Sequence, residues 1–264
     1  MVGMRQPRII KTESNEVTWK GENDDKGALN AFEKEYIKWT IDHYTVESKK
    51  WIVDMSCSEY VKKASDALRR EEEKVQGLLE KESGEKLLDE VQTVVITQHA
   101  EELLNNHRSG ASFLIEQNKM ADLKALTILF SKKPDTLKPL AEKLAVHAKS
   151  KGDDITKDKE TTKNAKLYIT KIIELKKKMD AMVLEGFEGI QLFFNACNKE
   201  IKIVLSAFEL SPEFLAEYFD YLMREGLRGK ESGTESLIAD AFSIFQLISS
   251  KDAFAHRHQV FNIF

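Results

Sequence analysis

This sequence runs for long stretches without proline or glycine, which limits the folds open to it. It contains 4 Pro and 12 Gly in 264 residues, and between them apolar residues recur every three or four positions. This spacing places apolar side chains on one face of an α-helix and argues against many short strands. We therefore predict an all-α fold that is more than half helix, has no paired strands and is elongated.

Breaks in the apolar pattern and capping residues give the expected helix boundaries. Ser56 and Ser58 supply N-cap hydroxyls for one helix, and Gly152 is placed at the C-terminal end of another. The expected helices begin at residue 28 and then cover residues 58–83, 87–104, 111–117, 119–131, 136–152, 167–183, 187–198, 200–208, 211–222 and 234–249, with a last short helix around residue 254.

Two aperiodic segments suggest how the chain is divided. Residues 1–27 are polar and have too little apolar surface to order, so we expect a flexible N-terminal arm. Residues 153–164 are charged and rich in threonine, which predicts a surface loop. The loop separates two groups of helices, residues 28–152 and 165–264, which we expect to be helical repeats stacked side by side.

The helix expected at residues 234–249 carries a dense apolar stripe. Ile238, Ala241, Phe242, Phe245 and Ile248 recur at helical intervals. We therefore predict that Phe242 and Phe245 are core residues.

Composition excludes several classes of partner. The formal net charge is −4, with 40 Lys and Arg against 44 Asp and Glu, so no global basic field would hold a nucleic acid. No stretch approaches the roughly 18 apolar residues that span a membrane. Cys57 and Cys197 are too few for a disulfide framework, and the N-terminus lacks the apolar run of a secretory signal. We expect protein partners, in the cytoplasm or the nucleus.

The histidines do not form a convincing metal site. His99 and His107 lie eight residues apart, whereas a helical metal pair prefers a spacing of about four. A solvated or C-capping role is the simpler interpretation. His256 and His258 lie near the C-terminus without cysteine or paired carboxylates, so no metal is expected there either.

Two further segments could in principle carry chemistry. Cys57 lies near a helix start, where the helix dipole could lower a thiol pKa, but no base is adjacent and a buried, inert thiol is expected. Gly226, Gly229 and Gly233 flank Lys230 after a helix instead of a strand, so we interpret them as a turn and not as a phosphate-binding loop.

Two charge runs remain. Residues 71–73 are three glutamates and residues 176–178 are three lysines, and both are expected to be solvated helix faces that could form part of a partner surface. No catalytic, cofactor-binding or metal-binding residue is predicted, and we do not expect an enzyme.

Several segments resemble the N-terminal region of cullins in order and spacing. Residues 44–48 (Tyr-Thr-Val-Glu-Ser), 58–64 (Ser-Glu-Tyr-Val-Lys-Lys-Ala) and 68–75 (Leu-Arg-Arg-Glu-Glu-Glu-Lys-Val) follow one another as in that family. Residues 211–220 (Ser-Pro-Glu-Phe-Leu-Ala-Glu-Tyr-Phe-Asp) and 251–254 (Lys-Asp-Ala-Phe) are similar to two later family segments. The resemblance covers the chain from about residue 28 to its end.

This resemblance implies five-helix cullin repeats joined into a curved stalk. Residues 28–152 would correspond to the second repeat and residues 165–264 to the third. A full cullin also has an earlier repeat that holds the substrate adaptor and a later domain that recruits the RING subunit. Neither region is recognisable, so those contacts are not carried over to this chain. We expect a fragment or a naturally short cullin-like protein, and the initiator Met with its polar arm favours the latter.

Three functions compete on this basis. The first is a non-catalytic scaffold segment of a cullin-RING ubiquitin ligase, or a short cullin-like protein that binds ligase components. The alternative is a generic α-solenoid adaptor unrelated to ubiquitination. An α-helical hydrolase or transferase is the third, and it would need an apolar pocket with convergent titratable groups.

Overall fold

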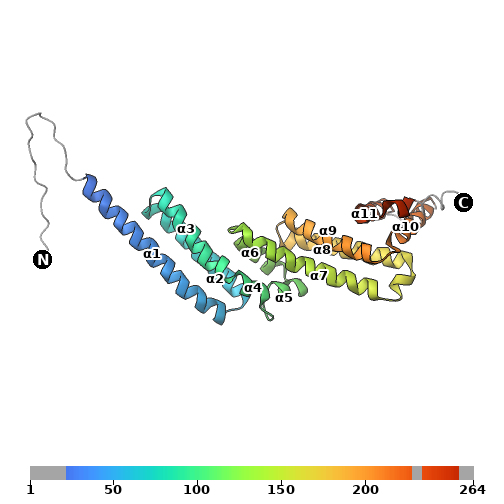
Figure 1. The fold of residues 1–264 in the computed structure, drawn as a ribbon, viewed down its shortest axis with the longest axis horizontal. Coiled ribbons are helices and arrows are strands. Elements are labelled where there is room, and N and C mark those ends of the chain that lie inside the picture. Colours follow the sequence, from blue (N-terminus) through green and yellow to red (C-terminus); the bar gives the residue numbers. More distant parts are fainter. Residues whose placement is uncertain (1–21, 228–233, 256–264) are drawn as a thin grey trace, which may run out of the picture.

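The computed structural model describes residues 22–227 and 234–255. No strand occurs within these residues, and the helices form an elongated stack with α1 at one end and α10 and α11 at the other (Figure 1). The predicted all-α, elongated fold is therefore confirmed.

The first half of the stack consists of three long helices followed by short ones. These helices are α1 (Glu22–Asp54), α2 (Cys57–Leu78), α3 (Lys81–Val95), η1 (Thr97–His99), α4 (Ala100–Asn105), α5 (Ala111–Glu116) and α6 (Met120–Ser131). The chain continues through η2 (Pro134–Thr136), α7 (Leu137–Lys157), η3 (Thr161–Lys163), α8 (Ala165–Gly186), α9 (Gln191–Ala207), α10 (Ser211–Leu227) and α11 (Thr234–Leu247).

Local capping explains where α2 begins. The Glu59 backbone N–H donates to Ser56 Oγ (3.4 Å), and the Ser56 backbone N–H donates to Glu59 Oε2 (2.9 Å). This reciprocal pair is a capping box, which satisfies two amide groups that the first turn would otherwise leave unpaired. The expected N-cap at Ser56 is confirmed.

A buried carboxylate sets the turn between α2 and α3. Glu33 of α1 is buried and accepts hydrogen bonds from the Glu80 backbone N–H (3.0 Å) and from Ser83 Oγ (2.8 Å). It thereby caps the start of α3 from a different helix. The helix expected over residues 58–83 is therefore wrong at its C-terminal end, because α2 stops at Leu78 and Gly84 lies inside α3.

The prediction that Gly152 ends a helix is wrong. It is buried within α7, which continues to Lys157, so the expected loop at residues 153–164 is partly helical. A β-carbon at position 152 would come within 2.6 Å of a Val204 methyl carbon in α9. Glycine is needed here for the close approach of two helices, not for a turn.

Three other boundaries differ from expectation. The helix predicted at 87–104 breaks at Ile96, and Tyr60 Oη donates to the Val95 carbonyl (2.7 Å), which satisfies an acceptor at the break. The helices predicted at 187–198 and 200–208 are one helix, α9. α1 begins at Glu22, inside the segment 1–27 that was expected to be an arm, and residues 1–21 lie outside the described residues.

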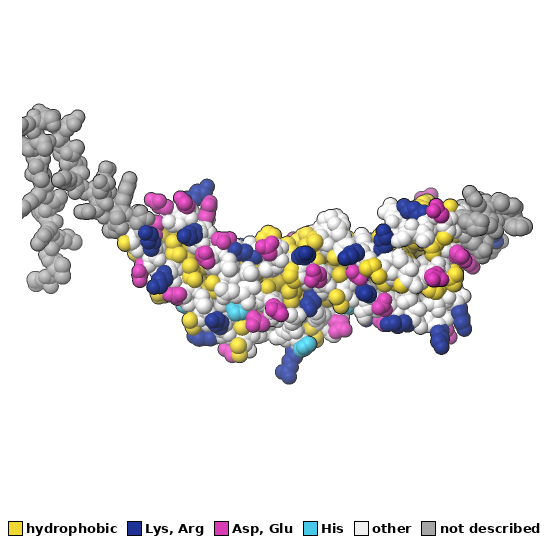
Figure 2. Space-filling model, viewed as in Figure 1, with side chains coloured by type: hydrophobic (Ala, Val, Ile, Leu, Met, Phe, Trp, Pro, Cys, Tyr) yellow, Lys and Arg dark blue, Asp and Glu magenta, His cyan; other side chains and the backbone are white. Residues whose placement is uncertain are grey.

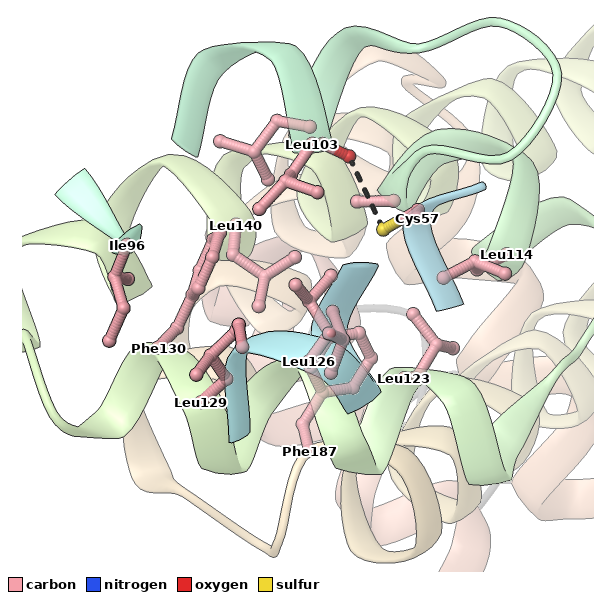
Figure 3. Close-up of a cluster of buried hydrophobic side chains, with 14 of the residues drawn as sticks. Cys57, Ile96, Leu103, Leu114, Leu123, Leu126, Leu129, Phe130, Leu140 and Phe187 are labelled. Carbon is pink, nitrogen blue, oxygen red and sulfur yellow. Dashed lines mark hydrogen bonds between the residues drawn. The ribbon is translucent and has the colours of Figure 1, made fainter. Parts of the chain in front are cut away.

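Two buried apolar cores fill the stack. Figure 3 shows part of the first core, to which Cys57 of α2, Phe130 of α6 and Phe187 at the end of α8 all contribute. The second core lies between the start of α8, the end of α9, α10 and α11. The long helices α8 and α9 contribute to both cores, because Met179 and Phe193 belong to the first and Ile172 and Ile201 to the second. The division into repeats at 28–152 and 165–264 stays a prediction.

The predicted burial of Phe242 is wrong. Its side chain is 53% exposed and meets Phe219 edge-on, with ring centroids 5.0 Å apart. Ala241 and Ile244 of α11 are buried, as is Ile248 directly after the helix. The inward face is therefore rotated relative to the predicted stripe. Phe245 is partly buried against the second core.

Candidate interaction surfaces

His99 is a buried structural residue and not the solvated or C-capping residue that was expected. Its Nε2 lies 3.0 Å from Ser48 Oγ of α1, its Nδ1 lies 3.1 Å from Glu102 Oε2, and its ring meets Tyr60 edge-on. These contacts tie η1 and α4 to α1. His107 is exposed in the turn after α4.

The structure groups no potential metal ligands within its described part. Among residues 22–227 and 234–255, no set of three or more His, Cys, Asp or Glu side chains is placed to hold an ion. His256 and His258 lie outside these residues, as do Gly229, Lys230 and Gly233 of the predicted turn, whereas Gly226 belongs to α10.

Cys57 is an inert thiol, as predicted. It is buried, its Sγ lies 3.8 Å from the Leu103 carbonyl oxygen, and burial raises the pKa of the thiol to about 12 (Figure 3). Burial likewise raises the pKa of Cys197 to about 12. A thiol with such a pKa is protonated at neutral pH and is a poor nucleophile.

The glutamate run is only partly the solvated face that was predicted, because Glu73 is exposed and Glu71 is not. Glu71 is buried and accepts hydrogen bonds from Tyr44 Oη of α1 and from Lys74 Nζ, both at 2.8 Å. Glu72 pairs at 2.7 Å with Lys132, which directly follows α6. Packing of α1 against α2 brings the Tyr44 hydroxyl to this face, which a single-helix pattern does not reveal.

The lysine run is also engaged within the fold. Lys176 pairs with Asp180 on the same helix (2.5 Å), and Lys177 pairs with Asp240 of α11 (2.5 Å). Lys178, the third lysine of the run, is exposed. Two of the three lysines therefore stabilise the second half of the stack and do not form an open basic patch.

The outer face of α1 carries an uncovered apolar stripe. Phe32, Trp39, Val46 and Val53 follow one another at seven-residue intervals and are 53%, 63%, 56% and 80% exposed. We call these four residues the outer stripe. A seven-residue apolar repeat is the pattern of a seam between packed helices. The spacing is visible in the sequence, but periodicity alone does not separate this stripe from the buried face of α1.

A second surface feature is a groove between α4 and α7, with a volume of about 560 Å³. Leu104 of α4 with Pro139 and Val146 of α7 form apolar parts of its wall, and Glu101 and Glu142 are charged residues of the two helices that line it. We call this feature the α4–α7 groove. Sequence reasoning missed it, because its walls come from segments about 40 residues apart that only the tertiary fold brings together.

The visible surface as a whole has no single sign of charge. Figure 2 shows Lys and Arg interspersed with Asp and Glu along the rod, with apolar patches between them. No helix in the described part of the chain combines the length and apolarity needed to cross a membrane.

Comparison with known proteins identifies this architecture. The Cullin family model, described as the cullin alpha solenoid domain, matches residues 17–260 and so includes every described helix. The chain belongs to the cullin family. The resemblance seen in the sequence is thereby confirmed.

Individual cullins match over most of this chain. Cullin-3 of Dictyostelium discoideum is 28% identical over 235 residues, which is 89% of this chain and 31% of that protein. Cullin-1 of the same organism is 29% identical over 237 residues (85% and 30%), and Cullin-3B of Arabidopsis thaliana is 27% identical over 224 residues (84% and 31%). This cullin chain spans about a third of the length of the curated relatives it matches.

Proposed function

We propose that this chain is a non-catalytic scaffold segment of a cullin-RING ubiquitin ligase, or a short cullin-like protein that binds ligase components. It acts through protein partners in the cytoplasm or nucleus. The proposal rests on the match of the chain to the cullin alpha solenoid domain. It is also supported by the elongated stack, in which α8 and α9 contribute to both cores.

Shared long helices suit a spacer. A scaffold raises the effective concentration of one bound component near another only if it holds them at a suitable separation. Because α8 and α9 each pack into both cores, bending between the cores would disrupt apolar contacts of both helices. The rod is therefore suited to keeping its two ends apart at a constant distance.

Three potentially reactive side chains support a non-catalytic role. Both cysteines are buried with raised pKa values, and His99 is held by Ser48 and Glu102 inside the fold. These groups are used for packing and helix contacts. General acid–base or nucleophilic catalysis needs such groups to face a substrate.

We assign the contact with a further helical unit of the scaffold to the outer stripe. Trp39 stacks on His43, with ring centroids 5.6 Å apart, and both side chains are exposed. α1 lies at one end of the stack (Figure 1), where a packed helix would extend the rod. The alternative role as a generic α-solenoid adaptor predicts no preference for ligase proteins.

Affinity capture from cell extract separates these two roles. The chain is used as bait beside two variants, Trp39→Glu and Leu184→Glu, which change equally exposed side chains (63% each) on α1 and α8. We expect the wild type and Leu184→Glu to enrich ligase subunits or the cullin exchange factor, and Trp39→Glu to lose them. Enrichment of trafficking or signalling proteins alone would favour the generic adaptor.

A discharge assay tests the non-catalytic part of the proposal. Purified chain is mixed with the RING subunit, a charged ubiquitin-conjugating enzyme and a ligase substrate, and ubiquitin discharge is compared with and without the chain. We expect no stimulation. Stimulation by this chain alone, repeated with independent preparations, would contradict the proposal.

A further inference from the structure

The α4–α7 groove has two walls with helical spacing. On α7, Pro139, Glu142 and Val146 line it at positions i, i+3 and i+7, and on α4, Glu101 and Leu104 line it three residues apart. Seven residues of helix rise by roughly 10 Å, or about two turns. A helix that presents apolar side chains every three or four residues would match the spacing of these walls.

The apolar wall is accessible to such a partner. Val146 is 67% exposed although it lies in the middle of α7, and Pro139 is also exposed, whereas Leu104 forms a buried part of the same lining. Apolar contacts in a groove supply most of the affinity when an amphipathic helix binds.

The charge around the groove is unbalanced. Glu101, Asp135 and Glu142 line it, all three are exposed, and none has an ion-pair partner among the residues that the structure describes. Lys143, the cation of the lining, donates a hydrogen bond to Asn105 Oδ1 (2.6 Å). Three carboxylates therefore face one lysine.

Nearby lysines do not correct this imbalance. Lys132 and Lys133 immediately precede η2, but they pair with Glu72 and Asp89 on α2 and α3, at 2.7 Å each. Lys138 is exposed but is not part of the lining. A partner with basic side chains beside an apolar face would complement the groove in both respects.

The groove is already formed in the free chain. The bond between Lys143 and Asn105 joins α7 to α4, and Thr136 Oγ1 of η2 donates to the carbonyl of Lys133, directly before η2 (2.7 Å). His99, directly before α4, is held by Ser48 of α1. Binding would therefore require little ordering of the chain itself.

We propose that the α4–α7 groove binds a basic amphipathic helix of another protein, which places apolar side chains against Leu104, Pro139 and Val146 and basic side chains near Glu101, Asp135 and Glu142. The proposal does not depend on the ligase role. It predicts that apolar contacts and charge attraction at the same site both contribute to the affinity for the partner helix.

The probe is a fluorescent peptide of roughly 14 residues, made only of leucine and lysine with leucine on one helical face. Its binding to the whole chain is measured by fluorescence anisotropy. Two matched double variants separate the groove from the general surface: Glu101→Gln with Glu142→Gln, and Glu73→Gln with Glu90→Gln, which changes exposed glutamates of α2 and α3. Each removes the same charge.

We expect the groove variant to weaken binding by about fivefold or more, and the control variant by less than about twofold. Val146→Ser should weaken binding as well, whereas a peptide with serine in place of leucine should not bind. Equal losses in the two double variants would show non-specific charge attraction and overturn the proposal. An unaffected Val146→Ser variant, or no binding by the wild-type chain, would also overturn it.

Discussion

Gly152 of α7 lies directly against Val204 of α9, so close that a β-carbon on residue 152 would come within 2.6 Å of a Val204 methyl carbon. Both residues are buried. The two long helices can approach this closely only because residue 152 has no side chain. Gly152 is the residue at which the sequence predicts that a helix ends.

Gly152→Ala should therefore destabilise the chain, although alanine is the better helix former. Helix propensity favours alanine by about 1 kcal/mol, but overpacking at a closed contact costs about 1–3 kcal/mol. We expect a net loss of unfolding free energy, measured by urea denaturation. The added substitution Val204→Ala should relieve the clash, so that the double variant loses less than the sum of the single losses. A Gly152→Ala variant more stable than wild type would contradict the close contact.

The two tryptophans Trp39 and Trp51 of α1 should differ sharply in their effect on stability. Trp51 is 7% exposed and meets Tyr44 and Tyr60 edge-on, whereas Trp39 is 63% exposed. We expect Trp51→Ala to cost on the order of 3–5 kcal/mol and Trp39→Ala less than about 1 kcal/mol. Chemical denaturation of both variants measures this difference, and similar losses would refute the assignment of the outer stripe.

A second pair of substitutions tests the register of α11. Phe242 is 53% exposed and Ile244 is buried. Phe242→Ala should cost less than about 1.5 kcal/mol, because part of its contact with Phe219 is lost, and Ile244→Ala about 2–5 kcal/mol. Thermal unfolding of both variants provides the comparison. The reverse order would restore the core position that the apolar stripe predicted for Phe242.

The capping carboxylate Glu33 should make stability depend on pH. Hydrogen bonds from the Glu80 backbone N–H and from the Ser83 hydroxyl lower the pKa of Glu33. A lowered pKa stabilises the fold above the unfolded value of about 4.3, and the stabilisation is lost as the pH falls through the folded pKa.

Glu33→Gln should consequently be less stable than wild type at pH 7, and this difference in unfolding free energy, the stability gap, should be smaller at pH 3. Urea unfolding at the two pH values measures the gap. Glu35→Gln, which changes an exposed glutamate two residues further along α1, serves as the control and should show no such gap. A gap of equal size at both pH values would mean that the Glu33 charge does not contribute.

Features that depend on one helix could be predicted from the sequence. The N-cap at Ser56, the all-α fold and the inert Cys57 follow from local propensity, periodicity and the absence of a neighbouring base. The cullin segments likewise identified the family, because their order and spacing are visible without a structure.

Features that depend on two helices could not. Nothing local to Glu71 indicates that Tyr44 will cover it, and nothing local to Gly152 distinguishes a close helix contact from a helix end. The α4–α7 groove is of the same kind, because Leu104 and Val146 meet only after the chain has folded. The sequence pattern describes each helix by itself, whereas the burial of a side chain depends on the helices that pack against it.

The sharing of α8 and α9 between the two cores has a consequence for dissection of the chain. A cut between α7 and α8 would leave the first piece without Met179 and Phe193, which complete its core, and would give the second piece two helices with half of their apolar faces uncovered. Neither piece would be a self-sufficient folding unit. Unfolding of either core should therefore destabilise the other, and the rod should unfold in a single cooperative transition.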